Sequence, residues 1–229
     1  MEILGLEKVS LVDYGGYVCA TIFTGGCNFM CPFCHNASLV KRNATTIEEK
    51  EVLEYLKSRT KLLDAVTISG GEPTLQKDLK LFIKKVKEIG YKVKLDTNGT
   101  NPTVLKELLE ENIIDYVAMD IKNNFDDYGA ITGLKVNLSD RVKQSLDILK
   151  NSNINYELRT TLVDEYHNKE NIIKLAKDLS GEKILYLQKF VDSGDLIGYE
   201  LNPVSKSQAL EFQKILSENI EKVVLRGYS

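Results

Sequence analysis

Three cysteines with short, unequal spacing are the residues of this chain best suited to hold an inorganic centre. Cys27, Cys31 and Cys34 form a C-x₃-C-x₂-C pattern within one short segment. This spacing lets a single loop place three thiolates around one centre. Structural zinc sites and electron-transfer [4Fe–4S] clusters usually have four protein ligands. Three cysteines on a [4Fe–4S] cluster would therefore leave one iron open to an outside molecule.

Two other interpretations of the cysteines remain open at this point. A zinc ion would need a fourth ligand from His35 or Cys19, and His35 directly follows Cys34, which would strain the loop. A thiol–disulfide centre would use Cys31 and Cys34, which have the C-x-x-C spacing of redox motifs, and would leave Cys27 without a role. Cys19 lies eight residues before Cys27 and is expected to be a buried packing thiol in the middle of a strand.

Composition narrows the class of protein. The chain has 229 residues, 43% hydrophobic and 28% charged, with a formal net charge of −3, which is typical of a globular domain rather than a disordered chain. The balanced charge does not favour nucleic-acid binding. No apolar run approaches the roughly 20 residues that a membrane-spanning helix needs, and the N-terminus lacks a signal-peptide pattern. We therefore expect a soluble, cytoplasmic protein that binds neither nucleic acid nor membrane.

The elements that must position these cysteines alternate between strands and helices. Apolar, β-branched runs predict six strands, at 17–24, 65–69, 92–97, 116–121, 155–162 and 183–191. Amphipathic patterns predict helices at 47–59, 77–89, 103–111, 140–150, 169–179 and 206–218. Six βα units predict an α/β fold with parallel strands, as an open or partial (β/α)6 barrel, with a doubly wound sheet as the alternative. We expect one domain over residues 1–229, with its ligand site at the carboxyl ends of the strands.

Local signals predict where several of these elements begin and end. Thr46-x-x-Glu49 and Ser205-x-x-Gln208 have the pattern of capping boxes, and Asn101-Pro102 has that of a cap before a first-turn proline. Gly90 occupies the position of a left-handed helix C-cap. Residues 223–225 could add an edge strand.

Polar residues follow the predicted strands at the edge where a ligand would bind. Gly70-Gly71-Glu72 follows the second strand, and its glycines allow close backbone approach while Glu72 offers a carboxylate to an ammonium group. Taken alone, this segment is also consistent with an ordinary turn before a helix. The later strands end in or contain the polar residues Asp96, Thr97, Asn98, Asp120, Lys122, Arg159 and Gln188. Arg159 is as well suited to an internal salt bridge as to ligand binding.

The cysteine segment, with aromatic Phe33 before the last cysteine, resembles the cluster loop of the radical S-adenosylmethionine (SAM) enzymes. Within that family, Cys31-Pro-Phe-Cys-His-Asn36 is similar to the loop of the glycyl-radical-enzyme activases. The opening segment from Gly5 to Tyr14 resembles one branch, the activating proteins of anaerobic ribonucleoside-triphosphate reductase. That branch usually has Asp-Tyr-Pro-Gly where this chain has Asp13-Tyr14-Gly15-Gly16.

The resemblance implies a [4Fe–4S] cluster on Cys27, Cys31 and Cys34, with SAM bound at its open iron. It implies that Gly70, Gly71 and Glu72 receive the SAM amino group and that Phe33 lies near the adenine. It also implies cofactor contacts for His35, Asn36, Asp96, Thr97, Asn98, Asp120, Lys122, Arg159 and Gln188. The expected reaction is reductive cleavage of SAM to a 5′-deoxyadenosyl radical, which takes a hydrogen atom from a glycine of a partner enzyme. The expected partners are a glycyl-radical enzyme and a flavodoxin- or ferredoxin-type electron donor.

Two alternative functions remain open. One is a radical SAM synthase that acts on a small molecule, similar to the 7-carboxy-7-deazaguanine synthases, and the other is a non-catalytic iron–sulfur electron carrier. For an activase we expect an open cleft beside residues 27–34, with the polar stretch 123–133 as the loop most suited to meet a protein surface. His167 lies in a polar stretch and is expected to be solvated.

Overall fold

The computed structural model describes residues 1–228, which form two compact units built from non-contiguous segments. The first unit comprises residues 1–28, 38–118 and 144–156, and the second comprises 29–37, 119–143 and the chain from 157 onward. The chain passes repeatedly from one unit to the other. That residues 1–229 act as one domain remains a prediction, and the units are described separately below.

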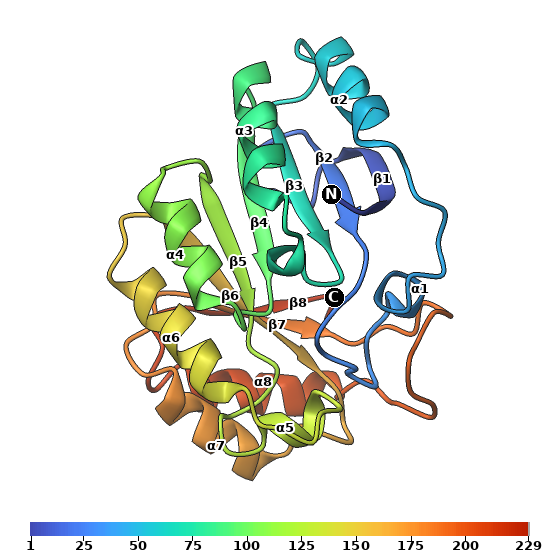
Figure 1. Cartoon of the computed structure of the whole chain (residues 1–229). Helices are drawn as coiled ribbons and strands as arrows, with labels where there is room; N and C mark the ends of the chain where they lie inside the picture. The colour runs from blue at the N-terminus through green and yellow to red at the C-terminus, as the bar shows by residue number, and fades with distance from the viewer. Residues whose placement is uncertain (229) are drawn as a thin grey trace. The chain divides into compact units, whose positions relative to one another are not determined.

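The first unit contains a mainly parallel sheet. Its strands β1 (Ile3–Ser10), β2 (Cys19–Thr24), β3 (Ala65–Gly70) and β4 (Lys92–Thr97) are adjacent in that order. β1 is antiparallel to β2, whereas β2, β3 and β4 are parallel. The helices α2 (Glu49–Ser58) and α3 (Leu79–Ile89) pack against each other along this sheet (Figure 1). α4 (Pro102–Glu110) follows β4.

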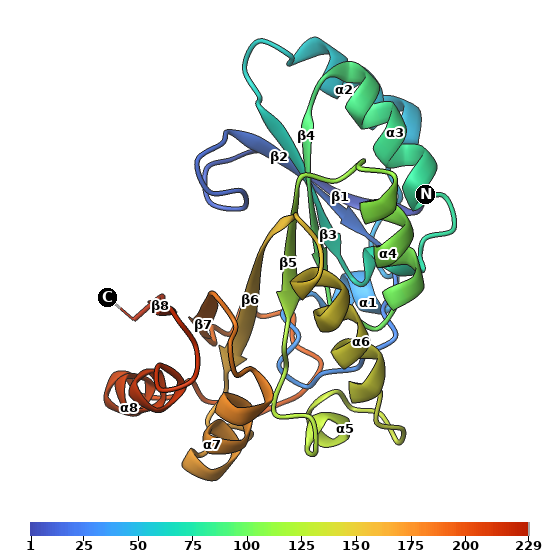
Figure 2. The same ribbon diagram turned by 90° about the vertical axis from the view of Figure 1, so that its left-hand side faces the viewer.

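The second unit continues the same alternation. β7 (Leu185–Lys189) is parallel to β6 (Asn155–Leu162) on one side and to β8 (Val223–Arg226) on the other. The helices α7 (Lys169–Asp178) and α8 (Lys206–Leu216) pack together, and α8 also contacts β8 (Figure 2). β5 (Tyr116–Asp120), β6 and α6 (Ser139–Lys150) each have residues in both units. Strand order in the sheet follows sequence order from β1 to β8.

The predicted strands and long helices are confirmed, with boundaries shifted by a few residues. The six predicted strands are β2 to β7, and residues 223–225 belong to β8. The sequence did not predict β1 or three short elements, which are α1 (Ala37–Val40), α5 (Tyr128–Ile131) and a 3₁₀ turn at Pro73–Leu75.

The cap predictions have mixed outcomes. Ser205 caps α8 in a reciprocal capping box with Gln208, and Gly90 ends α3 with a φ of 108°, as predicted. The capping box at Thr46 is wrong, because the N-cap of α2 is Glu48 and it makes no side-chain cap hydrogen bond. Asn101 is the N-cap of α4, but its amide donates to the carbonyl oxygen of Thr74 at 2.9 Å instead of capping the helix.

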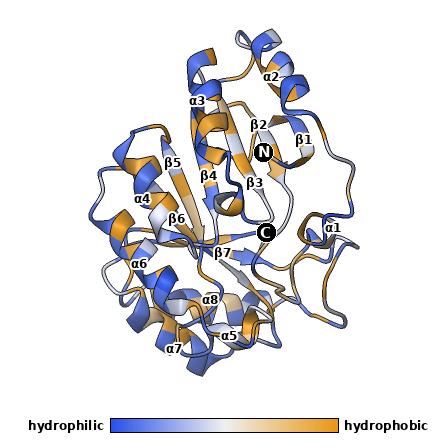
Figure 3. Cartoon of the chain, in the orientation of Figure 1, coloured by the Kyte–Doolittle hydropathy of each residue, from blue (hydrophilic) through white to orange (hydrophobic). Residues whose placement is uncertain are grey.

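The core forms where the apolar face of each helix meets the sheet. In α3 the residues Leu79, Phe82, Ile83 and Val86 recur at three- and four-residue steps and are buried. Hydrophilic and hydrophobic colours alternate along this helix in Figure 3. Complete burial of one such side chain contributes about 1.5–3 kcal/mol. This packing fixes β4, whose carboxyl end carries part of the candidate site.

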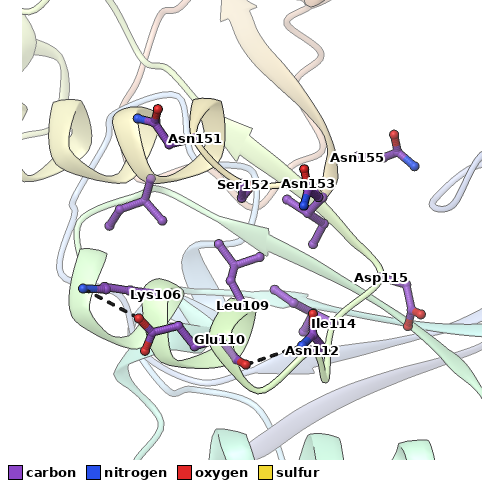
Figure 4. Close-up of a pocket in the computed structure, with 12 residues that line it drawn as sticks. Lys106, Leu109, Glu110, Asn112, Ile114, Asp115, Asn151, Ser152, Asn153 and Asn155 are labelled. Carbon is purple, nitrogen blue, oxygen red and sulfur yellow. Dashed lines mark hydrogen bonds and ion pairs between the residues drawn. The ribbon is translucent and has the colours of Figure 1, made fainter.

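A cavity of about 450 Å³ lies in the first unit at the amino ends of β5 and β6. Its lining comes from the end of α4 and from the segment after α6, and includes Asn112, Asn151 and Asn153 (Figure 4). It is therefore separate from the strand ends that carry the predicted residues. Among residues 1–228, no helix combines the length and apolar character required to cross a bilayer.

Candidate functional site

In the first unit, the residues that follow β3 are hydrogen-bonded to those at and after the end of β2, just before Cys27. The Gly71 N–H donates to Thr24 O at 2.9 Å, and the Glu72 N–H donates to Gly26 O at 2.8 Å. A Cβ added to Gly71 would overlap the Gly26 carbonyl group. Gly70 has a φ of +113°, which side chains rarely adopt. The two glycines therefore allow a close approach of two backbones, and they place the Gly-Gly-Glu turn against the base of the cysteine loop.

Glu72 joins this turn to the end of β4. Its side chain is fully buried, and Oε1 accepts hydrogen bonds from Thr74 N, Thr74 Oγ1 and Thr97 Oγ1 at 3.1, 2.6 and 2.7 Å. Oε2 accepts from Asn98 N at 2.7 Å. Burial raises the pKa of this carboxyl group, although the four hydrogen bonds oppose the shift. A SAM ammonium group would be a fifth donor to a carboxylate that has about four acceptor positions.

The remaining residues of the β4 end lie in the same network. Asn98 is buried and its amide donates to Cys27 Sγ at 3.8 Å. Asp96 pairs with Lys94 Nζ at 2.9 Å and accepts from Ser69 Oγ at 3.2 Å. Ser145 of α6 donates to Gly99 O at 2.6 Å and so fixes the turn from outside. The structure therefore brings Cys27, Gly70, Gly71, Glu72, Thr97 and Asn98 together in the first unit.

In the second unit, two connections hold the other half of the cysteine loop, which consists of residues 29–37. The connection after β5 contacts Met30, whose N–H donates to Thr132 O at 2.9 Å. The connection after β7 contributes three bonds: Gly198 N to Pro32 O at 2.7 Å, Ser193 Oγ to His35 O at 3.1 Å, and Ala37 N to Asp195 O at 3.1 Å. All four of these hydrogen bonds use main-chain atoms of the loop.

The stretch 123–133 is a packed segment and not the polar surface loop that the sequence predicted. Asn123, Asn124, Phe125 and Tyr128 are at most 5% exposed, and the stretch contains the helical turn α5. Its asparagines are used internally, since Asn124 Nδ2 donates to Asn123 Oδ1 at 3.1 Å and to Asp127 Oδ2 at 2.9 Å. Its polar composition serves to satisfy hydrogen bonds inside a packed segment.

A charged triad of the second unit lies at the end of β5 and in the middle of β6. Asp120 Oδ1 is 2.8 Å from Arg159 Nε, and Asp120 Oδ2 is 2.9 Å from Lys122 Nζ. Burial opposes ionisation of Asp120, but the two cations outweigh it and hold the pKa of the carboxyl group well below its usual range. Lys122 also lies 5.8 Å from the centre of the Phe33 ring. The salt bridge that the sequence offered for Arg159 is therefore present, and the triad includes two predicted cofactor residues besides Arg159.

His167 is buried, and the prediction that it is solvated is wrong. The ring is 1% exposed, with Nε2 3.0 Å from Lys122 O and Nδ1 3.1 Å from Val163 N. Burial lowers the pKa of His167, which favours the neutral ring. With Val163 N–H as donor to Nδ1, the proton lies on Nε2 and is donated to the Lys122 carbonyl group. His167 thus supports the main chain of the Asp120–Lys122 segment.

The cysteines differ in their surroundings. Cys19 is completely buried, as predicted, although it begins β2 rather than lying in its middle, and its thiol contacts Ser10 O at 3.6 Å and Thr67 Oγ1 at 3.7 Å. Burial raises the pKa of Cys31 to about 11 and also raises that of Cys34. A redox C-x-x-C pair uses a thiol of lowered pKa. The shifts at Cys31 and Cys34 are therefore opposite to those of a thiol–disulfide centre.

The cysteine thiols are the donors available to a cluster. Among residues 1–228, no three His, Cys, Asp or Glu side chains are gathered as ligands of a single metal ion. In a cluster each thiolate binds a different iron, so its sulfurs lie farther apart than the ligands of one zinc ion. None of the four cysteines, all of which lie within residues 1–228, forms a disulfide, and three of them lie on the loop held by the contacts above. Soft thiolate donors on such a loop fit an iron–sulfur cluster.

Three residues of the site were not predicted. Four predicted cofactor residues are described here by their burial or by their place in the sheet. Asn28, Thr100 and Gln76 brace the first unit, with Gln76 Nε2 donating to Gly25 O at 2.8 Å. Asn28 directly follows Cys27, and Thr100 lies two residues after Asn98, so their closeness to predicted residues could have found them. Gln76 gives no such signal. Phe33 is buried, His35 is exposed, and Asn36 is partly buried after Cys34. Gln188 lies on β7 in register with Thr161.

Comparison with known proteins identifies the family. Residues 21–179 match the model of the Radical SAM superfamily. The chain is 36% identical to a protein of Methanocaldococcus jannaschii named as a glycyl-radical enzyme activating enzyme, over 97% of this chain and 94% of the relative. It is 32% identical to the pyruvate formate-lyase-activating enzyme of Clostridium pasteurianum, over 91% of this chain and 86% of that enzyme.

A solved structure agrees in fold. SuiB of Streptococcus suis bound to S-adenosylmethionine has a TM-score of 0.70 at 15% identity, and the match covers 89% of this chain and 49% of SuiB. This likeness supports the predicted α/β fold with parallel strands. The cofactors of the family are a [4Fe–4S] cluster and SAM, which settles the choice between a cluster and zinc. The chain belongs to the radical SAM superfamily.

Proposed function

We propose that this protein is a glycyl-radical-enzyme activase. The observation that carries the proposal is the 36% identity, over nearly the whole chain, to a relative named for that activity. The similarity to pyruvate formate-lyase-activating enzyme supports it independently. Among glycyl-radical enzymes, we propose anaerobic ribonucleoside-triphosphate reductase as the partner, because the segment from Gly5 to Tyr14 resembles its activating proteins.

In this proposal Cys27, Cys31 and Cys34 hold the cluster. When bound, the cluster and SAM supply a 5′-deoxyadenosyl radical by one-electron cleavage of the sulfonium, and this radical takes a hydrogen atom from the partner's glycine. The protein contributes binding, orientation and exclusion of water. An external donor of the flavodoxin or ferredoxin type supplies the electron.

The protein groups have separate roles. The Gly70–Glu72 turn receives the SAM ammonium group, and Glu72 holds that turn to the end of β4 through its bonds to Thr97 and Asn98. Lys122 and Arg159, which bracket Asp120, offer two cations to the carboxylate or ribose of SAM. Buried Phe33 offers an aromatic surface to the adenine. His35, Asn36, Asp96 and Gln188 are proposed as further contacts.

The deciding experiment mixes anaerobically reconstituted protein with SAM, dithionite and purified candidate enzymes. Electron paramagnetic resonance should show a glycyl doublet on anaerobic ribonucleoside-triphosphate reductase, and SAM cleavage should accelerate when the partner is added. A partner whose radical glycine is replaced by alanine is the matched control and should give no doublet. A doublet on a different glycyl-radical enzyme would correct the partner and keep the activase function.

A small-molecule synthase is the competing function. It would cleave SAM with a heterocyclic substrate and give no glycyl doublet with any partner. A SAM-dependent product formed from a heterocycle, without a protein radical, would overturn the activase proposal.

A further inference from the structure

The side-chain amide of Asn98 has one defined orientation. Its Oδ1 accepts hydrogen bonds from Thr100 N at 3.0 Å and from Thr100 Oγ1 at 2.6 Å. Only the oxygen of a primary amide accepts hydrogen bonds, so two donors at this position identify it. The NH₂ group of Asn98 consequently faces the opposite side.

Both hydrogens of that NH₂ group have acceptors. One is Asn28 Oδ1 at 2.9 Å, and the other is Cys27 Sγ at 3.8 Å. Sulfur is larger than oxygen, so a hydrogen bond to it is longer. The contact directs an N–H group at the first cysteine of the loop.

A closed ring of hydrogen bonds keeps the amide in place. Asn98 donates to Asn28, Asn28 Nδ2 donates to Thr100 Oγ1 at 2.8 Å, and Thr100 Oγ1 donates to Asn98 Oδ1. All donors run in the same sense around the ring, which strengthens each bond. Asn98 is 5% exposed and Thr100 is 1% exposed. The main-chain N–H of Asn98 is held by Glu72 at 2.7 Å.

We propose that Asn98 sets the reduction potential of the iron–sulfur cluster by donating this N–H to the Cys27 sulfur. The inference rests on the proposed role of Cys27 as a cluster ligand. Reduction adds one electron to the cluster, and part of the added negative charge falls on the ligand sulfurs. A fixed N–H dipole stabilises that charge, so hydrogen bonds to the sulfurs raise the potential. The amide is oriented by folding, so no reorganisation is needed when the electron arrives.

The test measures the midpoint potential of the reconstituted cluster, without SAM and without a partner enzyme. In Asn98→Ala the N–H is lost and the potential should become more negative. At the wild-type midpoint, the ratio of reduced to oxidised cluster should fall about tenfold, which corresponds to about 59 mV for a one-electron couple. Redox titration followed by electron paramagnetic resonance measures this ratio.

Asn101→Ala is the matched control. Asn101 belongs to the same unit, and its amide donates to the main-chain oxygen of Thr74 at 2.9 Å. The same deletion there should leave the potential at the wild-type value. A potential that shifts equally in both variants would show a general loosening of the loop and would overturn the proposal.

The iron content of Asn98→Ala shows whether a changed potential reflects the lost hydrogen bond or a lost cluster. A full complement of iron in Asn98→Ala together with a wild-type potential would overturn the proposal. If that variant binds less iron, Thr100→Val decides, because it removes the hydroxyl group from the ring and leaves the Asn98 amide present. A smaller negative shift is expected there, and an unchanged potential in iron-replete Thr100→Val would count against Asn98. Absence of a glycyl doublet would refute the activase function and leave this measurement unaffected.

Discussion

At the scale of single residues, the site depends on buried polar groups that satisfy one another. Glu72 is the clearest case, because one carboxylate accepts hydrogen bonds from two threonine hydroxyl groups and two main-chain N–H groups. Glu72→Ala would leave these donors buried without an acceptor. We expect a loss of about 3 kcal/mol in the free energy of unfolding, measured by urea denaturation of the apoprotein.

Glu72→Gln is a second test of this residue, because it removes the carboxylate charge. It keeps the shape but turns one acceptor oxygen into a donor that faces other donors. If Glu72 also contacts the SAM ammonium group, both variants should weaken SAM binding by about 1.5–3 kcal/mol in cluster-loaded protein, measured by calorimetry. Normal SAM affinity in either variant would limit Glu72 to joining the two strand ends.

The buried thiols predict a pH dependence of the apoprotein. Alkylation requires the thiolate, and burial raises the pKa of Cys31 to about 11. Little Cys31 is therefore ionised at pH 8, and its rate of reaction with iodoacetamide should rise about tenfold per pH unit until the pH approaches 11. Peptide mass spectrometry of partly alkylated protein measures this rate. A rate at pH 8 equal to that of a free thiol would contradict the burial described for Cys31.

The sequence predicted most of these residues by type and position but not their contacts. Cys19 was expected to be buried, and it is. His167 was expected to be solvated because its sequence neighbours are polar, and local composition carries no information about the Lys122 carbonyl group that it meets 45 residues away. Asp120 and Arg159 are likewise 39 residues apart in sequence, and only folding of the sheet brings them together.

At the scale of elements, we expect the glycine contact between β2 and β3 to tolerate substitution least. Gly71→Ala would place a Cβ on the Gly26 carbonyl group. We expect destabilisation by about 1–3 kcal/mol from overpacking, together with reduced iron uptake, measured by thermal unfolding and iron assay. Gly15→Ala is the control, since a Cβ there meets no heavy atom of residues 1–228 within 4 Å. Equal stability of the two variants would contradict the close approach.

The two predicted capping boxes offer a second comparison of elements. Ser205→Ala should cost about 1 kcal/mol in the free energy of unfolding, because Ser205 accepts from Gln208 N. Thr46→Ala should change it by less than about 0.5 kcal/mol, since α2 has a different N-cap. Urea denaturation of both variants measures the difference, and equal losses would contradict the cap geometry.

Element boundaries were predictable where periodicity and caps agree, as in α3 and α8. β1 was missed because its burial does not alternate: Ile3 and Leu4 are both buried, whereas Glu7, Lys8 and Val9 are all exposed. Its register with β2 is also irregular, so the period of two that identifies a strand is absent. The prediction of a surface loop at residues 123–133 was wrong because it rested on their polar composition. Several of those polar side chains form hydrogen bonds with one another in the interior.

At the scale of the whole molecule, the six βα units predicted the parallel strands, and the resemblance of the cysteine loop to a known family predicted the cofactors. Ligand binding offers a test at this scale. SAM at one hundred times its dissociation constant should raise the free energy of unfolding of cluster-loaded protein by about 2.7 kcal/mol. Cys31→Ala, which should not hold the cluster, should show no such rise in thermal unfolding scans. Equal stabilisation of both proteins would place SAM away from the cluster.

The close glycine contact between β2 and β3 has a consequence for protein engineering. Backbone meets backbone there, so neither segment has side chains that can adjust to a changed neighbour. A chimera that receives the cysteine loop of a relative would inherit the path of Gly25 and Gly26 from one parent and that of Gly70 and Gly71 from the other. The two paths must agree within a fraction of an ångström. The cysteine loop and the Gly-Gly-Glu turn should therefore be transplanted together, as one cassette, although residues 38–69 separate them in the sequence.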